Sequence, residues 1–463
     1  MKRRTFLLSA LGAAMTTQSF ARNVFIRGKD VSYEPDAKLK STGLRIQDAV
    51  ELMEKREADN TAPVLREEIL DNPDAVFFIP AGVNDHHNWG GSWNSCNDQM
   101  ERLGGRVGSL LFQKGAYRGG KTFIKPNMVG GIRKAGQSYN TGGFVHPNFT
   151  VGLVDTLHDL GNSNVALGAR GAMRHEHYVE SGLMDLFNRH DLPLVEAHVQ
   201  YFKHYKKSEL VWHENPSGMV AKRFCTYRPV FEYGTTFINL AHAHVHKVGY
   251  TTLTIKNLQG VMPRGYGHIC DSWTHLDKWR RKLMDDFNPD FRVAIERSYV
   301  RHARKGYKYW DEGGFYQAYR TAGGYEEYLR NSDIADSRIF WAEIWAQRMM
   351  DMVEVLPKPY LNMVEGVFSR GDNGIFLSNF VTAGRSMVAV DAVTTWLMGH
   401  DPREVPYLRI ANERGLGENN IEKIPIFMLT EKGVERLKDY RLLKRTKLGL
   451  YIYGVDDNGL RYL

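Results

Sequence analysis

Short apolar runs that end in proline or glycine alternate along the chain with helix-length segments of mixed polarity. Ala75–Gly82 (AVFFIPAG), Thr122–Gly131 (TFIKPNMVGG) and Asn164–Gly171 (NVALGARG) are runs of this kind, and residues 149–160 between the last two have helical periodicity. Strand, loop, helix and strand in this order are typical of βαβ units. The sequence therefore predicts an α/β fold, a mostly parallel sheet with flanking helices, and ligand sites at the carboxyl ends of the strands.

Two segments lack this alternation of strands and helices, one before the core and one inside it. Residues 22–73 are polar and charged and are expected to form an N-terminal leader that packs on a core domain of residues 74–463. From about residue 270 to about 350 the chain is dense in Trp, Tyr and Arg without β-type runs, which predicts an aromatic-rich helical insertion. Its aromatic side chains either stack on a ligand or pack in the core. The sheet pattern resumes at Pro359–Phe368, and a short strand is expected to feed a helix within Arg385–Pro402.

The first 21 residues predict an export signal. Arg3 and Arg4 precede an apolar run too short to span a bilayer, and small residues before Arg22 fit cleavage after Ala21. The arginine pair resembles a twin-arginine signal, with an ordinary secretory signal as the alternative. We therefore expect a periplasmic or otherwise exported protein that meets the twin-arginine translocase. Because that route carries folded proteins, it also favours a bound metal or organic cofactor.

Composition narrows the classes of ligand. The three cysteines are far apart and form no CxxC pair, so no iron–sulfur cluster and no disulfide framework are expected. The net charge of +8 is spread along the chain, which favours an anionic substrate over nucleic acid. No segment after the signal is long and apolar enough for a stable membrane span.

Three histidines alternate in the stretch FINLAHAHVHK, Phe237–Lys247. In a strand, His242, His244 and His246 would share one face. Two of them could bind one metal ion together with a carboxylate or histidine from another loop. Alternatively, they line a polar wall and make hydrogen bonds.

Two Lys-plus-Asn sets are expected at strand exits of the sheet. Lys125 and Asn127 flank a proline, and Lys256 and Asn257 precede Gly260. Lysine supplies charge and asparagine orients an oxygen, so the two sets together suggest an anion pocket. The alternative for Lys125 is a solvated lysine in a turn.

Two acidic residues are expected at strand ends, Glu365 in VEG and Asp391 in AVDA. Each could be a metal ligand or a general base. Asp391 could instead lie at the start of a helix, where the helix dipole favours a carboxylate.

These stretches, in this order, resemble the DUF362 domain family. The similarity covers residues 122 to about 422, interrupted by the insertion, and is carried by FIKPNMV, HPNFTVGLVDTLHDLGNSNVALG, INLAHAHVHKVGYTTLTIKNLQG, KPYLNMVEGVF and VAVDAVTTWLMGHDP. The positions that match the family pattern are Lys125, Asn127, His246, Lys256, Asn257 and Asp391. Glu365 stands where aspartate is usual, His244 stands where lysine is frequent, and the ferredoxin-like cysteine module of many relatives is lacking.

The residues and the resemblance together give one functional hypothesis and one alternative. The hypothesis is an exported enzyme that depends on a metal or cofactor and acts on an anionic small molecule or saccharide. Redox chemistry is one candidate for its reaction. His246, Lys256 and Asp391 would be catalytic, Lys125, Asn127, Asn257 and Gly260 would bind the ligand, and His244, His246 and Glu365 would bind a divalent metal. The alternative is a non-catalytic protein that binds a metal, cofactor or ligand, or serves in maturation of a partner.

Overall fold

A computed structural model gives the fold. It describes residues 63–84, 96–115, 120–127, 144–168, 190, 194–195, 210–227, 235–246, 249–262, 345–371 and 374–449. The predicted signal peptide, most of the predicted leader and nearly all of the predicted aromatic insertion lie outside these residues.

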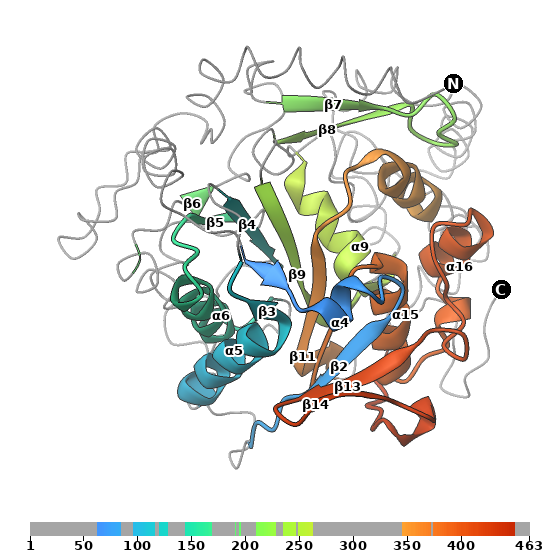
Figure 1. Ribbon diagram of the computed structural model, residues 1–463. Helices are drawn as coiled ribbons and strands as arrows, with labels where there is room; N and C mark the ends of the chain where they lie inside the picture. The colour runs from blue at the N-terminus through green and yellow to red at the C-terminus, as the bar shows by residue number, and fades with distance from the viewer. Residues whose placement is uncertain are drawn as a thin grey trace, which may run out of the picture.

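A ten-stranded mixed sheet runs through the middle of the described structure (Figure 1). Its strand order is β14-β13-β2-β12-β11-β9-β4-β5-β6, and β10 adds to β9. The strands are β2 (Val76–Pro80), β4 (Lys121–Pro126), β5 (Val165–Gly168), β6 (Leu194–Val195), β9 (Thr235–His246), β10 (Tyr250–Thr252), β11 (Leu361–Gly371), β12 (Gly374–Gly384), β13 (Ile426–Thr430) and β14 (Gly433–Arg436).

The expectation of a mostly parallel sheet is not confirmed. Strands β6, β5, β4, β9 and β11 pair in parallel, as do β2 and β13. However, β12 is antiparallel to both of its neighbours, and β10 and β14 also pair antiparallel. The reason is local: β11 and β12 form a long hairpin, and a hairpin connects antiparallel strands.

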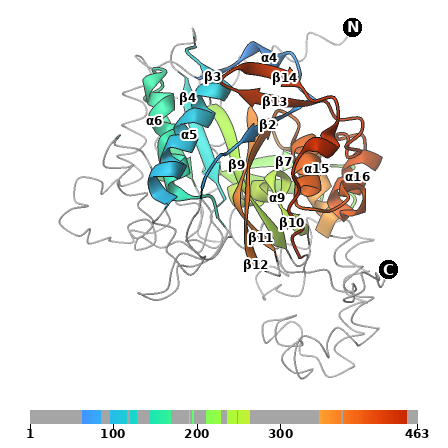
Figure 2. The ribbon, with the colours of Figure 1, turned by 90° about the horizontal axis from the view of Figure 1, so that it is seen from below.

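Helices cover the two faces of the sheet. On one face lie α5 (Asn97–Leu111) and α6 (Pro147–Asp159); on the other lie α9 (Thr254–Asn257), α15 (Met387–Leu397), α16 (Pro406–Glu413) and the helical residues 345–355 (Figures 1 and 2). The remaining short elements are β1 (Val64–Leu65), α4 (Glu67–Leu70), β3 (Phe112–Gln113), β7 (Leu210–Glu214), β8 (Arg223–Tyr227), η7 (Leu258–Val261), η10 (Pro402–Glu404) and η11 (Tyr440–Leu442). Each face buries its own apolar cluster, so the sheet separates two cores.

The predicted βαβ elements are present with small shifts in their ends. The first three apolar runs contain β2, β4 and β5, and the helical segment 149–160 lies within or next to α6. Close packing of α5 on α6 depends on glycine, because a Cβ on Gly152 would meet the Glu101 carbonyl oxygen at 1.9 Å. The start of α6 is held near the end of β4 by the Val145 amide, which donates to the Asn127 carbonyl oxygen at 2.9 Å.

The prediction of a short strand within residues 385–402 is wrong. Residues 387–397 form helix α15, and the strand that precedes it is β12, which ends at Gly384. Ser386 caps the helix, since its hydroxyl oxygen accepts from the Ala389 amide at 3.3 Å. The alternating MVAVDAV pattern looks like a strand because every side chain from Met387 to Thr395 is buried.

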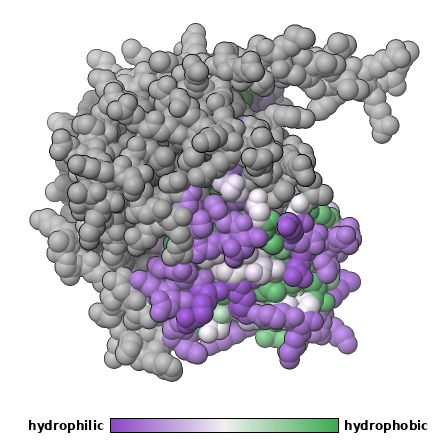
Figure 3. Space-filling model, turned by 60° about the vertical axis from the view of Figure 1, so that its left-hand side comes forward, coloured by the Kyte–Doolittle hydropathy of each residue, from purple (hydrophilic) through white to green (hydrophobic). Residues whose placement is uncertain are grey.

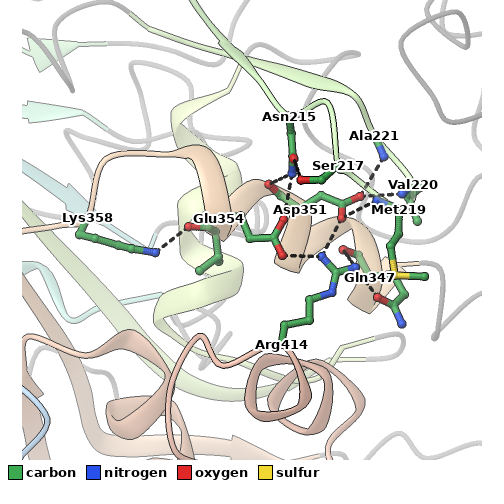
Figure 4. A network of polar contacts seen from close by, with 11 residues as sticks. Asn215, Ser217, Met219, Val220, Ala221, Gln347, Asp351, Glu354, Lys358 and Arg414 are labelled. Carbon is green, nitrogen blue, oxygen red and sulfur yellow. Dashed lines mark hydrogen bonds and ion pairs between the residues drawn. The ribbon is translucent and has the colours of Figure 1, made fainter. Parts of the chain in front are cut away.

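A buried carboxylate ties the β7–β8 hairpin to the helical residues 345–355 (Figure 4). Asp351 accepts from the backbone amides of Met219, Val220 and Ala221 at 3.0, 2.7 and 2.9 Å. Arg414, which follows α16, donates to it at 2.8 Å. Three segments distant in sequence are therefore joined at one side chain.

The described surface in Figure 3 is largely hydrophilic, with small apolar patches. Among the described large hydrophobic residues, only Met219 and Leu442 are exposed. None of the described helices has the length and apolar character needed to cross a membrane.

Candidate functional site

The carboxyl end of β4 lies beside the middle of β9, which at the same level pairs with the start of β11. These three strands and α9 carry most of the predicted site residues. Lys125 of β4 is in register with Asn239 of β9, and His242 of β9 is in register with Glu365 of β11. The structure brings Lys125, Asn127 and Asn257 together, and it separately brings His242 and His244 together and sets His242 next to Glu365.

Asn257 is the centre of a buried network on the α9 side of the sheet. Its amide nitrogen donates to the carbonyl oxygens of Lys125 and Leu240, each at 3.1 Å, and to Asn239 Oδ1 at 2.8 Å. Its Oδ1 accepts from the Lys125 ammonium and, at 3.3 Å, from Asn127 Nδ2. Lys125 and Asn127 therefore meet at one oxygen atom.

The network continues across the sheet as a chain of amides. Asn239 Nδ2 donates to Asn362 Oδ1 at 3.0 Å and to the Thr254 carbonyl oxygen at 2.9 Å. Asn362 Nδ2 donates in turn to the Arg385 carbonyl oxygen at 2.9 Å. The four asparagines, 127, 257, 239 and 362, thus bond head to tail and fix the end of β4, the middle of β9 and the start of β11 relative to α9.

Lys256 and Asn257 occupy a short helix, α9, where the sequence suggested a strand exit. The Lys256 side chain is only 4% exposed. Its positive charge helps to lower the pKa of His244, so the ammonium lies within electrostatic reach of that ring. Gly260 follows in η7 and is buried. The Lys-Asn pair is positioned by helix geometry and not by a turn.

His242 and His244 are buried neighbours. The Nδ1 atom of His244 lies 3.2 Å from the His242 carbonyl oxygen and 3.4 Å from His242 Nδ1. Because a carbonyl oxygen only accepts, the His244 Nδ1 atom is the donor in the first of these contacts. Burial lowers the pKa of His242 to about 3 and holds the pKa of His244 well below its ordinary value. Both rings are neutral at physiological pH.

Glu365 lies inside β11 and not at its end, 1% exposed. Its two carboxylate oxygens accept from the amides of His146, at 3.2 Å, and Val367, at 2.7 Å. Its Oε2 atom lies 3.8 Å from His242 Nε2. Burial raises the pKa of Glu365 to about 7, against the opposing effect of the amide donors.

His246 points elsewhere. Its Nδ1 accepts from the Gly249 amide at 3.2 Å, and its ring stacks on Trp345 with centroids 6.4 Å apart. The strand has turned by this point to pair with β10. His246 is therefore not brought into contact with Glu365, and His242 takes the place next to the carboxylate that was expected for His246.

Asp391 lies in the middle of α15 and not at a strand end or helix start. Its Oδ1 accepts from the amide and hydroxyl of Thr254 at 2.8 and 2.6 Å, and its Oδ2 accepts from the Ile255 amide at 3.0 Å. The Tyr407 hydroxyl donates to Oδ2 at 3.4 Å. Burial raises the pKa of Asp391 to about 7. Asp391 thus caps α9 from a neighbouring helix and orients the segment that carries Lys256.

A complete metal site is not assembled from the described residues. Within them, no group of three or more His, Cys, Asp or Glu side chains is placed to hold one ion. His242, His244 and Glu365 adjoin in pairs, but their nitrogen and oxygen atoms face one another and the backbone. The expected set of His244, His246 and Glu365 does not form here because His246 turns away.

Several residues of this site carried no functional signal in the sequence. Asn239 and Asn362 lie within strand patterns, and their separation of 123 positions hides their contact. His146 caps α6 and has proline after it, which is a helix-start signal. Arg370 is in register with His244 only because β11 pairs with β9. Topology, which the local pattern does not contain, was needed to find these residues.

Comparison with known proteins gives one match. A model of the family described as "Domain of unknown function (DUF362)" matches residues 122–396, more than half of the chain. No curated protein and no solved structure matches the chain. The match spans β4 to α15 and includes every site residue described above, so the resemblance seen in the sequence is confirmed.

Proposed function

The chain belongs to the DUF362 family, and we propose that it binds an anionic small molecule where the carboxyl end of β4 meets the middle of β9 and α9. The observation that carries this proposal is the burial of two lysines there, Lys125 at 2% and Lys256 at 4% exposure. Two buried lysines beside Asn257 raise the local positive potential, which favours an anionic ligand nearby.

The neighbouring groups support acid–base or redox chemistry on that anion. Neutral imidazoles and a carboxyl group of raised pKa at one strand edge are typical of active sites. We propose His244 as the group that contacts the ligand, because it is close to Lys256 and is the more exposed of the two buried histidines. Asp391 then has a positioning role through α9, in place of the catalytic role expected from the sequence.

Export by a twin-arginine route to the periplasm, and a divalent metal or other cofactor, stay part of the proposal. The described residues do not assemble a complete ligand set, so we derive no step through a metal. Elemental analysis of protein purified from the exported fraction tests this part, beside the His242→Ala/His244→Ala double variant. Stoichiometric metal that is lost in the double variant would make these rings ligands. Metal that is retained in the variant would place its site elsewhere in the chain.

Substitution of Lys256 by methionine tests the anion site. Methionine keeps most of the side-chain volume and removes the charge. We expect the affinity for inorganic phosphate and for citrate, measured by titration calorimetry, to fall at least about tenfold, since hydrogen bonds to charged groups contribute about 1.5–3 kcal/mol.

The matched control is Lys423→Met, at a lysine whose side chain is 69% exposed. Its affinity for both anions should equal that of the wild type. Equal binding by wild type and Lys256→Met, or no binding of either anion to the wild type, would contradict the proposal. Turnover of a bound anion would establish an enzyme, and binding without turnover would favour the alternative of a binding or maturation protein.

A further inference from the structure

The chain of asparagine amides ends at an unused acceptor. Asn127 is 1% exposed, and its Oδ1 atom has no hydrogen-bond partner within the described part of the chain. Its Nδ2 atom donates to Asn257 Oδ1. A buried amide oxygen without a donor costs about 1–3 kcal/mol, so such an atom in a site points to a missing partner.

The direction of the chain is fixed by groups that cannot reverse. Asn257 Nδ2 faces the carbonyl oxygens of Lys125 and Leu240, which only accept. Asn257 Oδ1 faces the Lys125 ammonium, which only donates. Asn257 therefore has one possible orientation.

The orientation of the Asn127 amide follows from that of Asn257. The atom of Asn127 that meets Asn257 Oδ1 must be a donor, so it is the nitrogen. Its oxygen then points away from the chain. Swapping the two atoms would set two oxygens 3.3 Å apart, with no proton between them.

The open end lies in the proposed anion site. Asn127 directly follows β4, and its backbone amide donates to the Leu240 carbonyl oxygen at 2.7 Å. The Lys125 ammonium and Asn127 Nδ2 share Asn257 Oδ1, so a positive charge lies next to the open acceptor. A second cation at Asn127 would be repelled by that charge, whereas a neutral donor would not.

We propose that Asn127 Oδ1 accepts a hydrogen bond from a hydroxyl group of the ligand, and that the ligand is therefore a hydroxylated anion. The inference rests on the proposed function and narrows its substrate class. It also reverses the expected role of Asn127, because the sequence suggested that this amide donates to a ligand oxygen. The asparagine chain presents a fixed acceptor, and the lysines supply the charge that holds the anionic group.

Matched pairs of probes test this. Glycerol 3-phosphate and propyl phosphate share a phosphate, while lactate, alanine and propanoate share a carboxylate and differ in carrying a hydroxyl, an ammonium or neither. In calorimetric titrations of the full chain, each hydroxylated probe should bind at least about tenfold more tightly than its deoxy counterpart. In Asn127→Ala this preference should disappear, so that the hydroxylated and deoxy probes of each pair bind with equal affinity. The control Asn412→Ala, at an exposed asparagine, should keep the preference.

The other outcomes distinguish a failure of the hydroxyl assignment from a failure of the anion site. Equal affinities within each pair would mean that only water meets Asn127, and would overturn the hydroxyl assignment while leaving the anion site in place. Tighter binding of alanine than of lactate would replace the hydroxyl with an ammonium donor. A preference that persists in Asn127→Ala would locate the hydroxyl elsewhere. Failure of all the probes to bind would overturn the anion site itself. The comparison within wild type needs no variant, so it holds even if Asn127→Ala folds poorly.

Discussion

Replacing Asp391 with alanine is expected to lower the free energy of unfolding by about 3–5 kcal/mol. The substitution leaves the buried amides of Thr254 and Ile255 without their acceptor, and each such donor costs about 1–3 kcal/mol. It also leaves a cavity in the apolar face of α15. Denaturant unfolding measures the loss, and amide hydrogen exchange at residues 254–257 should show that α9 opens first.

Two comparisons make the test specific. Glu413→Ala, at an exposed glutamate in an i,i+4 pair with Arg409, should cost less than about 1 kcal/mol. Asp391→Asn keeps one oxygen acceptor and should fall between the other two variants. A loss in Asp391→Ala no larger than that in Glu413→Ala would show that Asp391 does not cap α9.

The wild type and Asp391→Asn should also differ in how their stability depends on pH. Because the pKa of Asp391 is raised from 3.8 to about 7 in the folded protein, the stabilisation from its bound proton is complete below about pH 3.8 and is lost as pH rises through 7. Asp391→Asn has no such proton. Tyr407, the other titratable group in contact, stays neutral because burial raises its pKa well above 10. The stability of the wild type relative to Asp391→Asn should therefore decline by about 1.4 kcal/mol per pH unit between about pH 5 and 6, and by about half of that slope at pH 7. Parallel pH profiles would contradict the shift.

The parts of this site that could be predicted are those set by local pattern. Pro126 stands between Lys125 and Asn127 after an apolar run, and this local pattern alone predicts that both residues lie at a strand exit. The alternation of His242 and His244 likewise puts them on one side of β9. Both predictions need only the period of a strand.

Other assignments failed where burial removes the pattern. The segment around Asp391 is buried on all sides, so it shows neither strand nor helix periodicity. The sequence therefore predicts a strand followed by a helix where the structure has helix α15 from Met387 onward. Lys256 and Asn257 were assigned to a strand exit because a helix of four residues is too short to have a period. The role of His246 depended on a turn of β9 towards β10 that the alternating histidines do not reveal.

The asparagine chain could not have been predicted at all. Its bonds join β4, α9, β9 and β11, and they depend on β9 lying between the other two strands. An asparagine within a strand is ordinarily unfavourable, and INLAH and YLNMV each contain one. This local cost was the only available sign that these positions serve more than the strand.

The second large effect is expected at Asp351, in the helical residues 345–355. Alanine there should lower the free energy of unfolding by about 3–5 kcal/mol, because it removes the acceptor of three backbone amides and leaves Arg414 without this buried partner. Hydrogen exchange at residues 219–221 should rise with the loss of stability, since these amides hold the β7–β8 hairpin.

Glu354→Ala is the matched control, because this half-buried carboxylate bonds to the same arginine at 3.0 Å but to none of the three amides. It should cost less than about 1 kcal/mol, and an equal loss in both variants would mean that the arginine, not the amides, sets the effect. Asp351→Ala should leave phosphate affinity unchanged below its unfolding transition, whereas Lys256→Met should lower affinity with little effect on unfolding. If Asp351→Ala also weakened phosphate binding in the folded protein, the hairpin would have to be part of the anion site, which we propose at the end of β4, the middle of β9 and α9.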